Sequence, residues 1–182
     1  MPELHDEHLV RRCLDGDRAA FGTLVERHQK VVYNAAYRVT RDYEDASDVT
    51  QTVFVKVFER LDSYRPEFKF SSWLYKIAVN EAIDVVNRRQ AHVALDPAMA
   101  AQAPSPEDLV VAGQMSILLQ DSMMDLDVKS RVLVVLRHFA GLSYRELGYV
   151  LDVPEKTVKS RLFEARRLLA RLLAQRGVFA HE

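Results

Sequence analysis

Between Tyr64 and Arg89 the sequence interleaves aromatic and cationic side chains. The aromatic residues are Tyr64, Phe68, Phe70, Trp73 and Tyr75, and the cations are Arg65, Lys69, Lys76, Arg88 and Arg89. Aromatic faces stack on unpaired bases while cations hold the phosphate backbone, and each stacked base contributes about 1–3 kcal/mol. This segment therefore predicts contact with single-stranded nucleic acid. The alternative is that Trp73 and Ile77 are core residues and that the charges are solvated.

A second basic segment runs from Gly141 to Arg171. Ser143 and Glu146 have the spacing of a capping box that starts a short helix, and Pro154 interrupts the helical pattern. A longer helix follows from about residue 155, with an apolar stripe at Val158, Leu162, Ala165, Leu169 and Leu172. Its other face carries Lys156, Lys159, Ser160, Arg161, Arg166, Arg167 and Arg171. This pattern predicts a helix-turn-helix that places one helix in the major groove of DNA. The alternative is a two-helix hairpin with a solvated basic face.

Other kinds of chemistry have weaker signals. The acids between Asp42 and Asp48 lack the spacing of a calcium loop, and an acidic first helical turn explains them better. Three metal-ligand residue types, His5, His8 and Cys13, fall in one expected short helix, and this set alone does not define a metal site. The sequence has no nucleophile elbow, phosphate loop or supported pair of catalytic carboxylates. We therefore expect no cofactor, no metal and no enzymatic activity.

Composition places these two segments in a globular protein. The chain has 182 residues, a net charge of −1 and 48% apolar residues. Lys and Arg nevertheless outnumber Asp and Glu by 11 to 6 between residues 125 and 176, which points to a local polyanion contact. A single cysteine fits a reducing compartment. There is neither a run of about 18 apolar residues nor an apolar signal-peptide core, so we expect a cytoplasmic protein without membrane insertion.

The elements that carry these segments are predicted to be helices. Helices are expected over about 5–15, 17–40, 44–61, 71–90, 106–124 and 128–140, followed by the helix-turn-helix. Within 17–40 the expected core positions are Phe21, Leu24, Val25, Val31, Val32, Ala35, Ala36 and Val39. A proline- and alanine-rich stretch over 92–105 is predicted to be a linker. The fold class is therefore all-α, with two small helical domains, 1–91 and 106–182, joined by a flexible linker.

These two segments in this order resemble the sigma-70 family of transcription initiation factors, and its extracytoplasmic-function (ECF) group in particular. The resemblance rests on DVTQTVFVKVFERLDSYRPEFKFSSWLYKIAVNEAIDVVNRR (48–89) and on GLSYRELGYVLDVPEKTVKSRLFEAR (141–166). It implies a region 2 domain that binds core RNA polymerase and reads melted minus-ten DNA. It also implies a region 4 domain that reads minus-35 duplex.

The resemblance implies roles for individual residues. An exposed face comprising Asp48, Gln51, Thr52 and Phe54 would dock on the clamp helices of the polymerase largest subunit. Minus-ten capture would use Tyr64, Arg65, Phe70, Lys76 and Asn80, with Trp73 in support, because stacking and an amide can repay the cost of flipping a base. The minus-35 contacts would be Arg137, Lys156, Lys159, Ser160, Arg161, Phe163 and Arg166. Further expected partners are the polymerase flap and an anti-sigma factor. The acidic residues Asp96, Glu107 and Asp108, in and just after the linker, are expected to face the active-site cleft.

Four positions depart from the family pattern. Lys156 stands where glycine is usual, and Glu164 stands where a basic residue is frequent. Asp152 takes the place of a turn glycine, and Asp127 stands where Leu-Pro commonly opens the preceding helix. Glu164 puts negative charge near phosphates, which leaves the minus-35 sequence and binding strength open.

Two other functions compete with this interpretation. A LuxR-type activator has a very similar helix-turn-helix, but it has no need for the single-strand binding segment 64–89. A non-initiating module that only binds polymerase or an anti-sigma protein is the other alternative.

Overall fold

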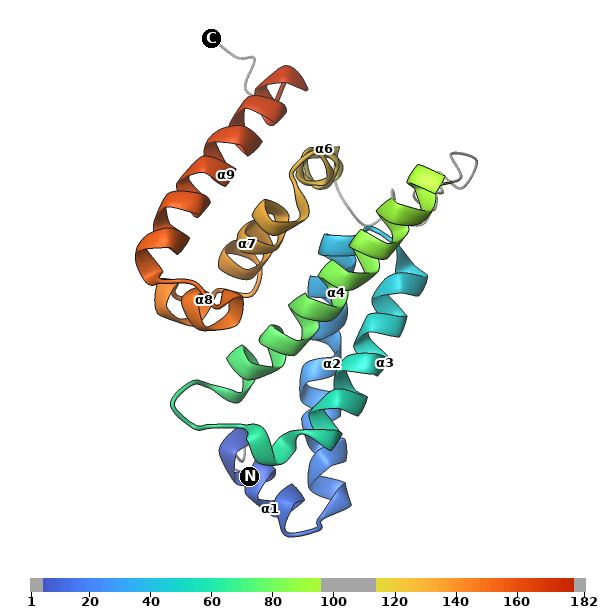
Figure 1. The fold of residues 1–182 in the computed structure, drawn as a ribbon, viewed down its shortest axis with the longest axis vertical. Helices are drawn as coiled ribbons and strands as arrows, with labels where there is room; N and C mark the ends of the chain where they lie inside the picture. The colour runs from blue at the N-terminus through green and yellow to red at the C-terminus, as the bar shows by residue number, and fades with distance from the viewer. Residues whose placement is uncertain (1–4, 96–113, 179–182) are drawn as a thin grey trace.

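The computed structural model describes residues 5–95 and 114–178, and within these ranges every regular element is a helix (Figure 1). The helices are α1 (Asp6–Leu14), α2 (Arg18–Thr40), α3 (Tyr43–Glu59), the 3-10 turn η1 (Leu61–Ser63), α4 (Phe70–Leu95), α6 (Gln114–Met124), α7 (Val128–His138), α8 (Tyr144–Leu151) and α9 (Glu155–Gln175). The predicted all-α class is confirmed. None of these helices is long and apolar enough to cross a membrane.

Side-chain caps start several of these helices. Asp17 accepts hydrogen bonds from the backbone N–H groups of Ala19 and Ala20, at 3.0 and 3.2 Å. Ser143 and Glu146 form the predicted capping box, in which each side chain accepts from the other residue's backbone N–H. Such caps satisfy N–H groups that have no partner within the helix.

The N-terminal half is a bundle in which α2, α3 and α4 pack side by side, with α1 against α2 (Figure 1). The apolar stripe of α3, made of Ala46, Val49, Val53 and Val57, is buried, and so are most of the predicted α2 positions. Phe21 and Val25 are half-buried, and Val31 is exposed, although all three were predicted to be in the core. Val31 lies one residue before the fully buried Val32, about 100° around the helix, and lines a hollow with Tyr75 of α4 and Phe139.

In the described residues of the C-terminal half, α9 packs on α6, α7 and α8. The turn between α8 and α9 is tight, because a Cβ added at Gly148 would lie 2.9 Å from the carbonyl oxygen of Val153. Asp152 ends α8 in the left-handed region, with φ of 53°. This backbone explains why glycine is usual at the Asp152 position in the family pattern.

The predicted linker boundary needs correction. α4 continues to Leu95, so residues 92–95 are helical and do not belong to a linker. Alanine-rich sequence favours helix continuation here, since the first breaker is Pro97. The remaining predicted linker, 96–105, and the predicted helix start at residue 106 lie outside the described residues.

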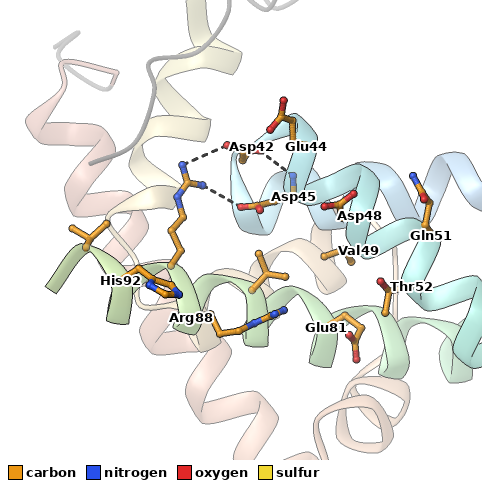
Figure 2. Close-up of a pocket in the computed structure, with 13 residues that line it drawn as sticks. Asp42, Glu44, Asp45, Asp48, Val49, Gln51, Thr52, Glu81, Arg88 and His92 are labelled. Carbon is orange, nitrogen blue, oxygen red and sulfur yellow. Dashed lines mark hydrogen bonds and ion pairs between the residues drawn. The ribbon is translucent and has the colours of Figure 1, made fainter. Parts of the chain in front are cut away.

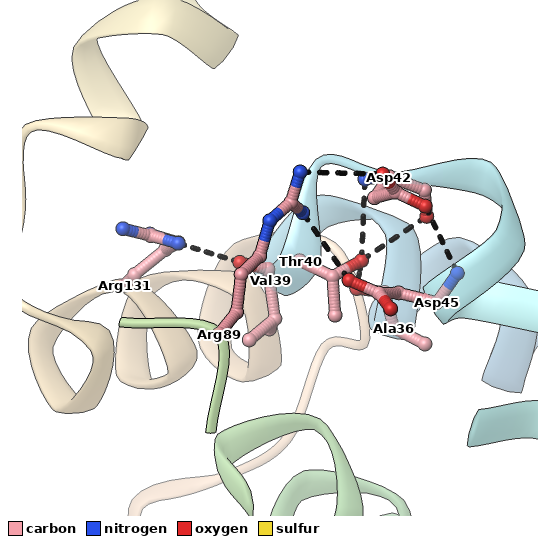
Figure 3. Close-up of polar contacts among 7 residues, drawn as sticks. All are labelled: Ala36, Val39, Thr40, Asp42, Asp45, Arg89 and Arg131. Carbon is pink, nitrogen blue, oxygen red and sulfur yellow. Dashed lines mark hydrogen bonds and ion pairs between the residues drawn. The ribbon is translucent and has the colours of Figure 1, made fainter. Parts of the chain in front are cut away.

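The two halves are in contact, which the two-domain prediction did not include. α7 packs on α2 and α4, and α8 packs on α4. Arg131 of α7 is only 4% exposed, and its Nη1 donates to the carbonyl oxygen of Val39 in α2 at 2.5 Å (Figure 3). The same guanidinium donates to the carbonyls of Met123, Met124 and Leu126. The helix-turn-helix is therefore held against the N-terminal bundle.

Candidate nucleic-acid interfaces

The loop before α4 is built on a buried aromatic cluster. Tyr64, Phe70 and Trp73 lie with ring centroids 5.7–5.8 Å apart, and all three are buried. The Tyr64 hydroxyl donates to the carbonyl of Phe68 at 2.9 Å, and burial together with Glu7 and Asp6 raises the pKa of Tyr64 to about 12. The hydroxyl therefore stays protonated at neutral pH, and its hydrogen bond to Phe68 holds the two ends of the loop together.

The expectation that Tyr64, Phe70 and Trp73 stack directly on bases needs correction for this conformation. Their faces are covered by protein, since Phe70 is only 1% exposed. Alternating aromatic and polar residues in a loop indicated exposure, but the aromatic rings turn inward, where they pack on one another and, for Phe70, on His28 of α2. Their role here is to support residues 65–69.

The polar candidates of this segment reach solvent. Arg65 and Asn80 are exposed, and Lys76 is partly exposed. The Arg65 guanidinium donates to the carbonyls of Asp62 and Tyr64, which braces the loop. Lys76 and Asn80 line a hollow of about 280 Å³ together with Lys56, Arg60, Ser63, Trp73, Ile77 and Glu81.

Lys56 and Arg60 were missed by the sequence analysis. Both come from the end of α3, and Lys56 is paired with Glu81 of α4. Their spacing of four residues places them on one helical face, directly before the loop. The sequence therefore shows that Lys56 and Arg60 share a helical face. It does not show that this face borders the hollow, because that depends on the packing of α3 against α4.

The candidate minus-35 residues of α9 are exposed. Lys156, Lys159, Ser160, Arg161 and Arg166 all face solvent, and Phe163 is 65% exposed. The Lys159 ammonium lies 2.7 Å from Glu155, and the Arg166 Nε donates to His138 Nε2 at 3.1 Å. Burial, Arg166 and Arg137 lower the pKa of His138, so its ring is neutral at pH 7 and accepts this hydrogen bond.

Arg137 differs from these residues. It lies in α7 and is half-buried, and its Nη1 donates to the carbonyl of Leu142 at 2.7 Å. Its guanidinium also lies 5.0 Å from the ring centroid of Tyr144. Arg137 therefore braces the connection between α7 and α8 in addition to any phosphate contact.

The exposed face of α3 differs from the predicted one at a single position. Asp48 and Gln51 are exposed and Thr52 is half-buried, but Phe54 is only 8% exposed and belongs to the core. Phe58 is instead 59% exposed. It lies seven residues after Gln51, which is two helical turns, and so continues the same face.

A hollow of about 640 Å³ borders this face, between α3 and the far end of α4 (Figure 2). Asp42 caps α3 through the N–H of Asp45, and Arg89 of α4 pairs with Asp42 and Asp45, at 3.4 and 3.2 Å (Figure 3). These acids therefore serve as a helix cap and as ion-pair partners. Asp48, Gln51 and Thr52 line the same hollow.

These features define a class: a two-part helical DNA-binding protein with a helix-turn-helix and a separate aromatic-braced loop. Residues 24–92 match the family described as Sigma-70 region 2, and residues 116–169 match Sigma-70, region 4. The ECF RNA polymerase sigma factor SigW of Bacillus subtilis (strain 168) is 31% identical across 90% of this chain and 94% of that protein. The ECF RNA polymerase sigma-E factor of Escherichia coli (strain K12) is 34% identical across 92% and 93%.

Solved structures agree with this assignment. CnrH, in complex with the cytosolic domain of CnrY, is 29% identical with a TM-score of 0.71, across 93% of this chain and 97% of that chain. The sigma factor RpoE of Bartonella quintana, solved with the anti-sigma factor NepR, is 20% identical with a TM-score of 0.69 across 85% and 96%, which shows a shared fold. The chain belongs to the ECF RNA polymerase sigma factors of the sigma-70 family. It is thus a transcription initiation factor, and the region 2 match disfavours a LuxR-type activator.

Proposed function

We propose that the two halves divide promoter recognition between them. The N-terminal half, through α4, binds core polymerase and captures melted minus-ten DNA, and residues 106–182 anchor on minus-35 duplex. The supporting observation is the separation of two cationic surfaces, one exposed and one made of the exposed Arg60 with the half-buried Lys56 and Lys76. One is the solvent face of α9, and the other surrounds the hollow beside Asn80. Residues 96–105 would link the two halves.

The minus-ten role rests on the hollow at the end of α3. Its volume of about 280 Å³ suits one base, and its lining offers an exposed amide from Asn80 and the cations Lys56, Arg60 and Lys76. A flipped base costs a few kcal/mol to unstack, and hydrogen bonds to its edge together with stacking can repay that cost. Asn80 would supply the base-edge hydrogen bonds, while the cations neutralise neighbouring phosphates.

The minus-35 role belongs to α9. Side chains at the N-terminal end of a recognition helix reach base edges, which fits Lys156, Lys159, Ser160 and Arg161, and Phe163 offers an apolar contact to a thymine methyl group. Arg166 and Arg137 would contact phosphates, which position the helix without specifying sequence. Glu164 lies on the exposed face and would repel phosphates, so it limits how deeply α9 enters the groove.

Core polymerase would dock on the exposed face of α3. We assign this contact to Asp48, Gln51 and Thr52, with Phe58 in place of the buried Phe54. An exposed aromatic next to polar groups is typical of a protein-binding hot spot. The clamp helices of the largest subunit are the proposed partner, with the flap as the partner of the C-terminal half. Asp96, Glu107 and Asp108 are proposed to thread toward the active-site cleft.

We further propose a protein partner of the anti-sigma kind and a cytoplasmic location, where core polymerase acts. The CnrH structure supports such a partner, because it holds CnrH together with a second protein.

Run-off transcription from genomic fragments with purified core polymerase tests the proposed function. The wild-type chain should give promoter-specific transcripts, and Arg65→Ala with Asn80→Ala should abolish them while core binding in a pull-down is kept. Arg18→Ala, which removes an exposed cation from the start of α2, is the matched control and should transcribe normally. Transcripts that need a second sigma factor would contradict the proposal.

A further inference from the structure

One face of α8 lies against the loop and the first turns of α4. Arg145, Glu146 and Tyr149 of α8 and its C-cap residue Asp152 lie on this side, because each of them contacts the loop or α4. The opposing residues are Phe68, Lys69, Ser72 and Lys76, which follow helical spacing. Every member of one set contacts a member of the other set.

The aromatic part of this contact is a stack. The rings of Phe68 and Tyr149 lie with centroids 4.1 Å apart and an interplanar angle of 12°. The guanidinium carbon of Arg145 lies 5.3 Å from the centroid of the same Phe68 ring. Phe68 is thus the aromatic residue of the loop whose face is turned outward, and Tyr149 occupies that face.

The charged part places carboxylates on the lysines of α4 and its loop. Asp152 lies 2.5 Å from the Lys76 ammonium, which also lies 4.9 Å from the Tyr149 ring centroid. Glu146 accepts a hydrogen bond from Ser72 at 3.1 Å and lies 3.8 Å from the Lys69 ammonium. Two carboxylates therefore flank one stacked aromatic ring.

This order of acid, aromatic ring and acid matches what a nucleic-acid strand presents, which is phosphate, base and phosphate. Single-strand binding sites combine cations for the backbone with aromatic faces for the bases. Lys69, Phe68 and Lys76 offer that combination. In this structure Glu146 lies beside Lys69, Tyr149 stacks on Phe68, and Asp152 pairs with Lys76. Asp152 is available for this role because it stands where the family pattern has glycine, which would have no carboxylate.

We propose that α8 is an intramolecular mimic of single-stranded DNA. In the closed chain it occupies the strand-binding surface formed by Phe68, Lys69 and Lys76, and melted DNA takes the same surface only after α8 leaves. Phe68 is then a stacking platform for a base of the captured strand. The competition with DNA rests on the proposed minus-ten role of this segment, whereas the closed contact itself does not.

Substitutions on the two sides of the stack separate these roles. Tyr149→Ala and Asp152→Gly free the surface, so they should open the chain and raise its affinity for single-stranded DNA by about two- to fivefold, the range expected for exposed contacts. Phe68→Ala should open the chain equally but lower that affinity by about fivefold or more, because a stacking platform is lost. Asp15→Asn removes one exposed carboxylate far from the contact and is the charge-matched control.

Two measurements on the full chain test the proposal. Fluorescence energy transfer between dyes on cysteines introduced at Glu59 and Arg171, both exposed, in a Cys13→Ser background reports closure. Anisotropy of a fluorescein-labelled pool of random 12-nucleotide single-stranded DNA reports binding. Transfer should fall in all three variants and on adding the DNA pool, whereas affinity should change in opposite directions for Tyr149→Ala and Phe68→Ala.

Unchanged transfer in Tyr149→Ala and Phe68→Ala would overturn the closed contact. If energy transfer fell but Tyr149→Ala and Phe68→Ala changed the affinity for single-stranded DNA in the same direction, the proposed mimicry would be overturned. Either failure leaves promoter-specific run-off transcription by the wild-type chain intact, whereas loss of that transcription would instead contradict the proposed function.

Discussion

The guanidinium of Arg131 donates to the carbonyl oxygen of Val39, 92 residues earlier in the chain, at 2.5 Å. With Met123, Met124 and Leu126 it satisfies four carbonyls in a buried position. These carbonyls lie at or just beyond the ends of α2 and α6, where helices leave acceptors without internal partners. One side chain therefore caps the C-terminal ends of α2 and α6 and links the two halves of the chain.

Replacing Arg131 should strongly destabilise the protein. Arg131→Met removes every donor and leaves buried carbonyls unpaired, so we expect a loss of about 2–4 kcal/mol in the free energy of unfolding. Arg131→Lys should recover only part of this loss, because one ammonium cannot match the planar guanidinium. Urea unfolding followed by circular dichroism measures both. Arg171→Met, at an exposed arginine of α9, is the control, and an equally small effect at both sites would contradict the role of Arg131.

The left-handed conformation of Asp152 can be tested separately from its ion pair. Asp152→Gly should change the free energy of unfolding by less than about 0.5 kcal/mol, because relief of backbone strain offsets the lost contact and the added freedom of the unfolded chain. Asp152→Val should cost about 1–2 kcal/mol, because a β-branched residue fits the left-handed region poorly. Thermal unfolding compares the two variants. Equal stabilities of the glycine and valine variants would rule out strain at this turn.

The two phenylalanines of α3 should separate folding from polymerase binding. Phe54→Ala creates a cavity in the core and should cost about 3 kcal/mol of stability. Phe58→Ala should cost much less stability but weaken binding to core polymerase about tenfold or more, as at an aromatic hot spot. Unfolding curves and a titration with labelled core polymerase provide the two readouts. Wild-type affinity in Phe58→Ala would remove Phe58 from the docking face.

Stability should depend on pH through Glu146. Burial raises the pKa of this carboxyl. Hydrogen bonds from Ser143 and Ser72, together with the charge of Lys69, lower the pKa by more than burial raises it, so the folded pKa lies below the usual 4.5. The stabilisation by the ionised carboxylate is complete above about pH 4.5 and is lost as the pH falls through the folded pKa. The difference in unfolding free energy between wild type and Glu146→Gln should therefore be constant from pH 6 to 7 and shrink below pH 4. A pH-independent difference would contradict this linkage.

Local signals in the sequence were enough to predict the helices and their caps. Asp17, Ser143 and Glu146 act on backbone groups two or three residues away. Packing between distant segments decided the residues that were predicted wrongly. Phe54 and Phe58 are both apolar residues of α3, and the packing of α3 against α2 and α4 determines which of them is buried. The sequence pattern of Tyr64, Phe70 and Trp73 is typical of base-stacking residues, but in the fold all three rings are buried beneath the loop.

The contact between the halves was also beyond prediction from sequence. Arg131 looks like one more cation of a basic segment, because its four acceptors are backbone carbonyls that leave no pattern in the sequence. Asp152 was noticed as a departure from the family pattern, but its partner Lys76 lies 76 residues away. Long-range pairs of this kind become visible only in three dimensions.

Footprinting of a promoter by reconstituted holoenzyme tests the division of promoter recognition most directly. Nuclease protection reports minus-35 binding, and permanganate reactivity of thymines reports melting at minus ten. Asn80→Ala should keep the upstream protection while the melted thymines disappear, and Arg161→Ala should reduce both, because the anchor is lost first. Normal melting in Asn80→Ala, or full upstream protection in Arg161→Ala, would contradict the assignment of the two surfaces.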